Sequence, residues 1–547
     1  MKWRHDVRRG AMLIGLACAA GQAAAFKLDT APEWDVNFDN SVQYTMGWRA
    51  QDINPNIGNH PFFAQGDYKF EKKGDMVTNR VQDLMEFQGV YEGRMGFRVS
   101  ASLWKDFAYN DEAKQNPAYA GVNAYSNNTY SHHTKKYFQE GTELLDAFVF
   151  MNGKVGDTPV YAKAGRFSQY WGNSFFFGFQ NIAYGQQPID YIKGFSQPGS
   201  EVKELFLPRN QISLQADLSP ELSVAGQYFL EYEPNRYPEA GTYLGFFDVL
   251  FDGPNNPNGT GFLPMVNDGI VKPKNNNKNY GLKVSWAPEW AGGDMGFYYR
   301  QLDEVDPWPA LVNPASGHLQ STVAEKVKLI GFSYERSFGL LSTGFEINQR
   351  RHTALSSAGL VATNQGAKGT ITNIIANGMM QLGSNALWDA GILLGEFSFT
   401  HLNKVTDNAQ YYNGVGTANC VNPITGGAGS YRDGCATRNA LAFAMLFSPQ
   451  WLQVWPGVDL EMPISLTMGV RGNGAYRAGS FYAQDSKIYS IGIKATVDSK
   501  SSVALQYNGY YWRPGPSNGT YYAGYGGNGP VSLNDRGWLQ LTFKTSF

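Results

Sequence analysis

The sequence predicts an all-β protein, a closed antiparallel β-barrel that crosses a membrane with its strands. Stretches that alternate between apolar and polar residues recur along the chain, and most span roughly 9 to 14 residues, which suits tilted membrane strands better than soluble ones. Short and long connections take turns between these stretches. The composition agrees, because only 17% of the 547 residues are charged while 14% are aromatic.

The first 25 residues have the pattern of an export signal. Lys2, Arg4, Arg8 and Arg9 form a positive segment, residues 11–20 are apolar, and three alanines precede Phe26. A positive segment, a short apolar segment and small residues at the cleavage point define a secretory signal peptide. We therefore expect residues 1–25 to be removed and residues 26–547 to form one outer-membrane barrel domain.

Seventeen alternating runs are the candidate strands. In residues 94–104, for example, Met95, Phe97, Val99, Ala101 and Leu103 alternate with smaller or polar residues. Such alternation places one set of side chains on each face of a strand. The runs are 34–48, 81–91, 94–104, 143–153, 158–168, 209–218, 222–232, 279–287, 293–302, 326–335, 340–350, 387–402, 437–448, 460–471, 485–497, 501–513 and 535–547.

The connections set the strand count. Long ones, such as 108–142 and 169–208, read as extracellular loops, and short ones, such as Glu92-Gly93, read as periplasmic turns. This alternation fails once, between residues 350 and 436, and an added strand near 371–382 restores it. The prediction is 18 strands, with 16 as the alternative if 293–302 or 371–382 is a loop. A soluble array of β-sandwiches does not explain why long and short connections take turns.

The final run ends the chain on an aromatic residue. Leu539, Leu541, Phe543, Thr545 and Phe547 share one face of it. A terminal Phe that closes an apolar strand face in an exported chain is typical of the signal that barrel-assembly machinery reads. We expect Phe543 and Phe547 to serve as this assembly signal, and outer-membrane lipid to surround the finished barrel.

Four stretches resemble one large proteobacterial outer-membrane family of porin-like barrels, which is known mainly as a domain of unknown function. They are residues 74–80 (GDMVTNR), 95–101 (MGFRVSA), 165–172 (GR, then YWG) and 198–205 (PGSEVKEL). The resemblance covers nearly all of residues 26–547 and implies a porin-like barrel. Relatives tend to occur beside a periplasmic lipoprotein-carrier-like protein and an inner-membrane transporter of the resistance-nodulation-division type. The resemblance therefore implies traffic of lipids or hydrophobic molecules, and these two partners.

The inward positions of the runs carry both signs of charge. Mixed charge indicates a water-filled or internally paired lumen, without strong selectivity for anions or cations. The alternative is that these side chains are ordinary paired wall residues. The candidate lumen-wall residues are Arg98, Glu346, Arg350, Glu461, Arg471 and Lys494.

Segment 169–208 is the candidate constriction loop. Its aromatic residues are too concentrated for a free surface loop, so the loop either folds into the barrel or forms an interfacial girdle. Its candidate pore residues are Tyr170, Trp171, Phe175, Phe176 and Phe177. Arg166 and Lys193 add positive charge that favours a carboxylate end on the cargo. Strict alternation points Arg166 at lipid, whereas a bulge at Gly165 turns it inward.

Cys420 and Cys435 fall in one predicted extracellular loop that is rich in glycine. The exported chain meets an oxidising compartment, so we expect them to form a disulfide. The histidines show no metal-ligand spacing, and no nucleophile pairs with them, so we expect no metal site, no cofactor and no enzyme. The formal charge of -2 argues against nucleic acid as a partner.

The preferred function is an outer-membrane channel that passes small, partly hydrophobic or amphipathic molecules by passive diffusion. The alternative is the outer-membrane subunit of a system that exports or assembles lipids or hydrophobic compounds with an inner-membrane transporter.

Overall fold

The structure is a computed structural model that describes residues 26–28, 31–60, 65–110, 112–114, 129–196, 202–239, 241–246, 267–273, 278–358, 362, 365–476, 481–523 and 528–547. The expected signal peptide, residues 1–25, lies outside the described residues. In the part of the chain that is described, no helix combines the length and the apolar character that a membrane-crossing helix needs.

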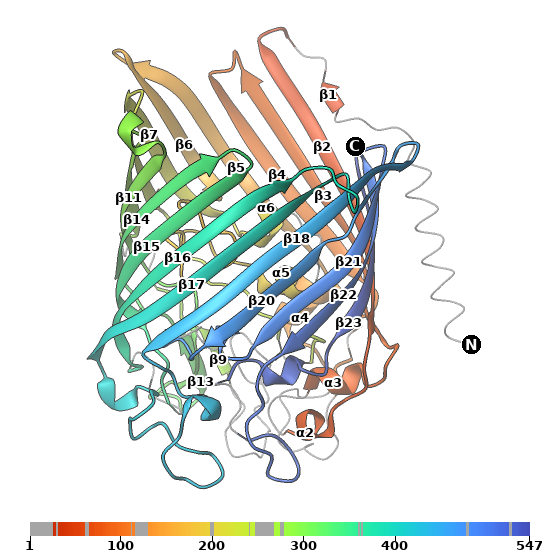
Figure 1. Cartoon of the computed structure of the whole chain (residues 1–547), viewed down its shortest axis with the longest axis vertical. Helices are drawn as coiled ribbons and strands as arrows, with labels where there is room; N and C mark the ends of the chain where they lie inside the picture. The colour runs from red at the N-terminus through yellow and green to blue at the C-terminus, as the bar shows by residue number, and fades with distance from the viewer. Residues whose placement is uncertain are drawn as a thin grey trace.

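Eighteen antiparallel strands close into one barrel (Figure 1), which confirms the predicted fold class and the predicted count. The barrel closes where β2 pairs with β23, from Ser41 opposite Ser546 to Arg49 opposite Trp538. The strands are β2 (Trp34–Arg49), β3 (Met76–Tyr91), β4 (Met95–Asp106), β5 (Glu140–Val155), β6 (Thr158–Phe167), β7 (Arg209–Ser219), β8 (Leu222–Phe229), β10 (Tyr280–Trp286), β11 (Asp294–Leu302), β14 (Val327–Phe338), β15 (Leu341–Ala354), β16 (Lys368–Leu382), β17 (Ala390–Asp407), β18 (Asn439–Trp455), β19 (Val458–Glu461) continued by β20 (Ile464–Arg471), β21 (Lys487–Val497), β22 (Ser501–Tyr511) and β23 (Trp538–Ser546).

Two of these elements form one interrupted strand. Both β19 and β20 lie between β18 and β21. The break falls at Met462-Pro463, where proline has no N–H to give to the ladder. The backbone stays paired around the break, because Met462 N donates to Pro449 O at 3.0 Å and Gly492 N donates to Pro463 O at 3.0 Å.

The runs at 293–302 and 371–382 correspond to β11 and β16, so the 16-strand alternative is wrong. The turn between β3 and β4 shows why the short connections are tight. Glu92 and Gly93 both have positive φ, 46° and 67°, as a two-residue turn between right-twisted strands requires. Such short turns lie at one end of the barrel and the long loops at the other (Figure 1).

Most of the small elements lie in the long loops, whereas β1 precedes β2 and η4 lies in the short connection between β10 and β11. β9, β12 and β13 form a separate three-stranded sheet, which the sequence does not predict. The small elements are β1 (Phe26–Leu28, paired with β2), α2 (Pro55–Gly58), α3 (Gln65–Lys69), α4 (His132–Thr134), η3 (Lys135–Gln139), α5 (Tyr191–Ser196), α6 (Val202–Leu205), β9 (Asn267–Ile270), η4 (Glu289–Ala291), β12 (Trp308–Val312), β13 (Leu319–Thr322), η5 (Ala409–Tyr411), η6 (Tyr431–Asp433) and η8 (Val531–Leu533).

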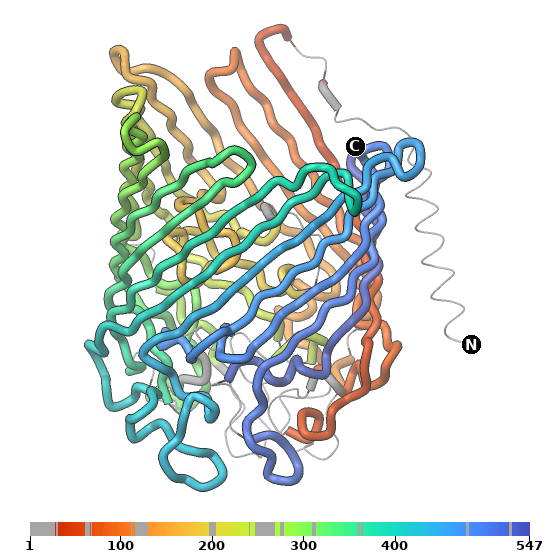
Figure 2. The backbone as a smooth tube through the Cα atoms, in the orientation of Figure 1, coloured from red at the N-terminus to blue at the C-terminus, as the bar shows by residue number. Residues whose placement is uncertain are grey.

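The two faces of the wall differ in chemistry. Along β17, the outward side chain of Phe397 is 52% exposed, while its inward neighbours Glu396 and Ser398 are buried. Outward Val149 and Met151 of β5 are likewise 59% and 54% exposed. An apolar outer face suits lipid, and a polar inner face is buried only where something fills the barrel. Loop segments cross the interior behind the front strands (Figure 2), and the larger cluster of buried apolar residues includes rings from these segments, such as Phe179, Tyr184 and Tyr237.

Candidate functional site

The described parts of segment 169–208, residues 169–196 and 202–208, leave the wall after β6, lie in the barrel interior and return to the wall at β7. Its α5 and α6 are the yellow elements that lie behind the front strands in Figure 1. The segment contacts β15 and β17, which are far from β6 in the strand order. It therefore spans the lumen instead of lying on the rim.

Glu396 of β17 holds the first part of this segment. Its carboxylate accepts hydrogen bonds from the backbone N–H groups of Phe175, Phe176 and Phe177 at 2.6, 3.0 and 2.9 Å, and from Ser174 Oγ at 2.9 Å. Consecutive N–H groups that converge on one anion form a backbone nest. Hydrogen bonds to a charged acceptor are stronger than neutral ones, so this buried carboxylate fixes the path of the loop.

Glu346 of β15 is a second anchor. Its carboxylate accepts from the N–H groups of Asn173, Ser174 (3.0 Å) and Ile182 (2.9 Å). Gly172 precedes these donors with φ at +99°, and a Cβ there would collide with Glu346 Oε1. Glycine is therefore required at this point both for its backbone angle and for the space beside the carboxylate.

Wall arginines bind the carbonyl groups of the same segment. Arg300 Nη1 donates to Ile182 O at 2.8 Å and to Tyr184 O at 2.7 Å, and Arg209 Nη2 donates to Gly185 O at 3.0 Å. The wall thus presents anions to the loop's N–H groups and cations to its carbonyl groups. This pairing satisfies backbone groups that are buried far from any regular element.

An aromatic cavity of about 290 Å³ lies against the loop. Ten of its 21 described lining residues carry aromatic rings, and these rings come from the 169–208 segment and from the loop that precedes β21. The lining includes Tyr170, Phe175, Phe176, Phe179, Tyr184, Tyr191, Phe195, Phe206, Phe481 and Tyr482, together with Asn181, Gln187 and Asn235.

Stacked rings build one wall of this cavity. Tyr191 stacks on Tyr237 with ring centroids 5.0 Å apart, on Phe179 at 5.7 Å and on Phe195 at 5.8 Å, and Phe481 stacks on Phe179 at 5.8 Å. Burial raises the pKa of Tyr191 far above its ordinary value, so this phenol stays neutral. Offset aromatic packing of this kind makes a rigid, flat and apolar surface.

The predicted pore residues divide into two groups. Tyr170, Phe175 and Phe176 line the cavity. Trp171 and Phe177 do not, because both are buried against the wall: the Trp171 ring lies 6.2 Å from that of Tyr298, and Phe177 packs with Ile375, Ala442 and Ala444.

The two predicted cations do not reach the cavity either. Lys193 is buried with Nζ 3.8 Å from Glu143, whose carboxylate also binds Arg236. Arg166 lies on the outer face, since β5 and β6 pair without a shift and Arg166 stands opposite Ala147, the outward neighbour of Phe148. There its Nη1 is 2.7 Å from Glu231 Oε1. The inward bulge at Gly165 is therefore wrong; the register shift falls between β4 and β5 instead.

The candidate lumen-wall residues mostly pair with one another or with the filling. Arg98 bonds Glu86 and lies 3.4 Å from Asp146, and Lys494 Nζ lies 3.5 Å from Glu461 Oε2. Arg350 is buried with its guanidinium 4.0 Å from the centroid of the Tyr184 ring.

Arg471 is a correction to the predicted lumen wall. A register shift between Leu441 and Ala442 places it opposite Leu441, which pairs with Phe399 on the outer face. Its side chain is exposed there. A single shift of this kind reverses the face of every residue beyond it.

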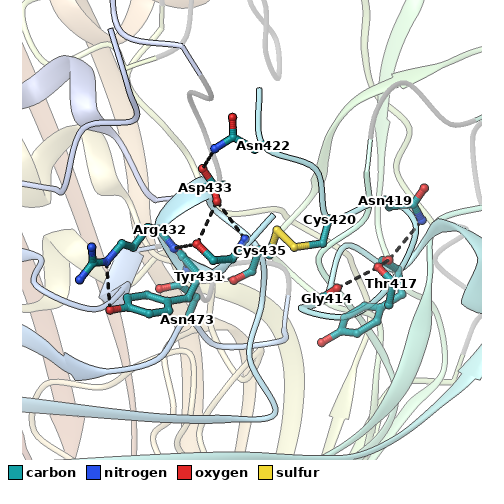
Figure 3. The surroundings of a disulfide bond; sticks show 12 residues. Gly414, Thr417, Asn419, Cys420, Asn422, Tyr431, Arg432, Asp433, Cys435 and Asn473 are labelled. Carbon is teal, nitrogen blue, oxygen red and sulfur yellow. Dashed lines mark hydrogen bonds between the residues drawn. A yellow bond between two sulfur atoms is a disulfide. The ribbon is translucent and has the colours of Figure 1, made fainter. Parts of the chain in front are cut away.

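Cys420 and Cys435 are joined by a disulfide in the loop between β17 and β18, with Cα atoms 5.5 Å apart (Figure 3). The short helix η6 lies between them, and its cap is reciprocal: Arg432 N donates to Ser430 Oγ at 3.2 Å, while Ser430 N donates to Asp433 Oδ2 at 2.9 Å. Asn473 Nδ2 donates to Cys435 O at 3.1 Å and ties this loop to the one after β20.

The terminal strand places its aromatic residues at the barrel seam. Phe543 stands opposite Tyr44 of β2 and Val503 of β22. The backbone of Phe547 exchanges two hydrogen bonds with Asn40, at 2.8 and 2.9 Å.

Sequence reasoning missed Glu396, Phe481 and Tyr482. Glu396 had a visible signal, since it is a charged residue at an inward position in the middle of an apolar run. Phe481 and Tyr482 had none, because they lie in a loop and reach the cavity only through the folded chain. Within the described ranges, no group of three or more His, Cys, Asp or Glu side chains is placed to hold a metal ion.

Solved structures similar to this chain are outer-membrane channels at low identity. OccAB4 of Acinetobacter baumannii is 8% identical, with 94% of this chain and 98% of that chain covered and a TM-score of 0.43. OpdK of Pseudomonas aeruginosa, solved with vanillate, is 8% identical, with 93% of this chain and 98% of that chain covered and a TM-score of 0.40. DcaP of A. baumannii is 9% identical, with 96% of this chain and 100% of that chain covered and a TM-score of 0.36.

No curated protein matches the sequence. A family model described as "Protein of unknown function (DUF1302)" matches residues 7–547, nearly the whole chain. The chain belongs to the DUF1302 family, which confirms the resemblance that its sequence motifs indicated.

Proposed function

We propose that this protein is an outer-membrane channel that passes small, partly hydrophobic molecules by passive diffusion. The observation that carries the proposal is the aromatic cavity inside a closed barrel, on a loop fixed by Glu346 and Glu396. A transmembrane barrel with a shaped interior site offers a route across the membrane, and the residues that line its narrow part set selectivity.

The outer membrane is the proposed location for two reasons. The barrel carries an apolar outer face, with side chains such as Val149 and Met151 exposed to the surroundings. Closed barrels of this kind belong to outer membranes. The sequence also begins with the pattern of an export signal, whose cleavage is part of the proposal.

The 169–208 loop is proposed as the constriction. It occupies the lumen at the level of β15 and β17 and brings Tyr170, Phe175 and Phe176 to the cavity. Flat ring faces attract apolar and aromatic solutes without a strict demand on shape. The passage is then narrow for so wide a barrel, and it favours partly hydrophobic cargo over sugars of the same size.

Solute flux through the purified protein tests this proposal. The protein is reconstituted into liposomes, and efflux is compared for pairs of solutes of equal size, one hydrophilic and one with an aromatic ring. We expect flux above that of empty liposomes, with the aromatic member of each pair faster. Folded protein that carries no solute on its own overturns the channel and favours an export or assembly subunit that works with an inner-membrane transporter.

A further inference from the structure

The aromatic cavity has no charged side chain among the described residues of its lining. None of the described residues that line it is Asp, Glu, Lys, Arg or His. The buried charges around it are engaged behind the lining. Glu396 accepts hydrogen bonds from the backbone of Phe175 and Phe176, and Glu304, Asp306 and Arg350 line a separate small void that the Phe179 and Tyr184 rings also border. A charged ligand group in the aromatic cavity would lose its hydration with no opposite charge in contact.

The cavity nevertheless offers unpaired polar groups. Gln187 is only 5% exposed, and its Oε1 has no hydrogen-bond partner among the residues that the structure describes. Asn181 is 3% exposed, and its Oδ1 has no partner within the same described residues. A buried amide left without a partner costs free energy, so such groups mark places where a ligand completes the bonding.

The hydrogen bonds around Asn181 fix which of its atoms is free. The Tyr170 hydroxyl donates its one proton to Ser174 O at 2.7 Å. The same hydroxyl oxygen can then only accept, and Asn181 Nδ2 donates to it at 2.9 Å. The free atom of Asn181 is therefore the carbonyl oxygen, which accepts a hydrogen bond and repels a carboxylate.

The two cations expected from the sequence to attract a carboxylate are occupied elsewhere, because Lys193 is beside Glu143 and Arg166 is paired with Glu231 on the outer face. Arg350 of the lumen wall faces the Tyr184 ring. We propose that the cavity binds uncharged aromatic or fused-ring molecules that carry a hydrogen-bonding group such as a hydroxyl, and that it discriminates against carboxylates. This inference rests on the proposed channel and names its substrate class.

The volume fits this class. A cavity of about 290 Å³ has room for a fused-ring molecule. The ring lies between Phe176, Phe179 and Phe481, and its hydroxyl meets the amides of Asn181 and Gln187.

Binding of four matched probes tests the inference. The full-length protein in lipid nanodiscs is titrated calorimetrically with naphthol, naphthoate, a naphthyl ammonium cation and naphthalene, with empty nanodiscs subtracted. We expect naphthol to bind at least roughly tenfold more tightly than naphthoate and the cation. Naphthoate or the cation binding as tightly as naphthol overturns the inference.

Variants locate the site. We expect Gln187→Leu to weaken naphthol binding by roughly 2- to 12-fold, the worth of one hydrogen bond, and to leave naphthalene within about twofold. Gln506→Leu is the matched control, because Gln506 is in β22 and bonds Asn508 away from the cavity. Equal naphthol affinity in all three proteins, each shown folded by heat-modifiable migration, overturns the role of Gln187.

The same preparations are measured for conductance in planar bilayers. Conductance without a preference for naphthol overturns this inference and leaves the channel standing. A preference for naphthol without conductance overturns the channel and leaves the binding site.

Discussion

Glu396 of β17 accepts a hydrogen bond from the backbone N–H of Phe177 at 2.9 Å, across 219 positions of the chain. The bond belongs to a set in which one buried carboxylate collects three consecutive N–H groups and a serine hydroxyl. The 169–208 loop is thereby attached to the wall opposite the strands from which it emerges. Its position follows from this attachment and not from the length of the loop alone.

The Glu396 anchor can be weakened by a substitution that keeps the shape of the side chain. We expect Glu396→Gln to loosen the loop by about 2–3 kcal/mol, because charge-assisted bonds become neutral and the amide nitrogen faces N–H donors. Hydrogen exchange at the amides of residues 175–177 should then speed up by roughly 30- to 150-fold. Glu461→Gln is the control, since Glu461 bonds Ser448 and lies near Lys494 rather than the loop. Unchanged exchange in the Glu396 variant contradicts the anchor.

Glu304 should give the extracellular half of the protein a pH-dependent stability. Burial, opposed by nearby Arg350, raises the pKa of Glu304 from 4.5 to about 7. Below pH 4.5 the folded and unfolded states both hold the proton and the stability is complete; between 4.5 and about 7 only the folded state holds it, so stability falls as pH rises. The loss is on the order of 3 kcal/mol.

Thermal unfolding in detergent at about pH 5 and about pH 8 measures this loss. We expect Glu304→Gln to reduce the difference between the two transition temperatures, because the amide does not titrate. A difference that is the same in the variant assigns the pH dependence to other groups.

The disulfide should stabilise its own loop and leave the channel alone. Closing the loop between Cys420 and Cys435, which are 15 positions apart, constrains the unfolded segment by about 3 kcal/mol in the chain-entropy model. A variant with both cysteines replaced by serine should be cut faster by protease between residues 414 and 436, at unchanged conductance. Two alkylatable thiols in the unreduced mature protein would falsify the bond itself.

Phe547 should matter more for assembly than for the finished barrel. Its backbone bonds with Asn40 survive in Phe547→Ala, so this variant removes the ring alone, worth about 1.5–3 kcal/mol if fully buried. We expect much less surface barrel at low expression but nearly normal heat stability in what does assemble. Equal accumulation of wild type and variant refutes the signal role.

The strands of the barrel wall could be predicted from the sequence, because a lipid-facing surface requires an apolar residue at every second position of a long strand. All 18 strands follow from alternation and from the order of short and long connections, including β16, which only the connection order required. Strict alternation also places Arg166 correctly on the outer face, but it places Arg471 on the wrong one. The face of Arg471 depends on a register shift between β18 and β20, and the pattern of a single strand does not contain that information.

The interior was predictable only in part. The aromatic density of 169–208 already indicated burial, and Glu346 was visible as an inward charge. The sequence did not show that the cavity lining is uncharged. That property depends on the ion pairs of Lys193 with Glu143 and of Arg166 with Glu231. These contacts join separate loops and strands, and only the closed barrel brings them together.

The central claim is that the 169–208 loop limits passage through the barrel. Single-channel conductance in planar bilayers tests it most directly, with the residues between Phe175 and Gly194 replaced by a short flexible linker. The control removes the two residues between Gly426 and Gly429, in the loop that carries the disulfide. We predict higher conductance, with faster uptake of hydrophilic solutes, in the first variant and wild-type values in the second. Wild-type conductance in the first variant, with its barrel shown to be folded, contradicts the account.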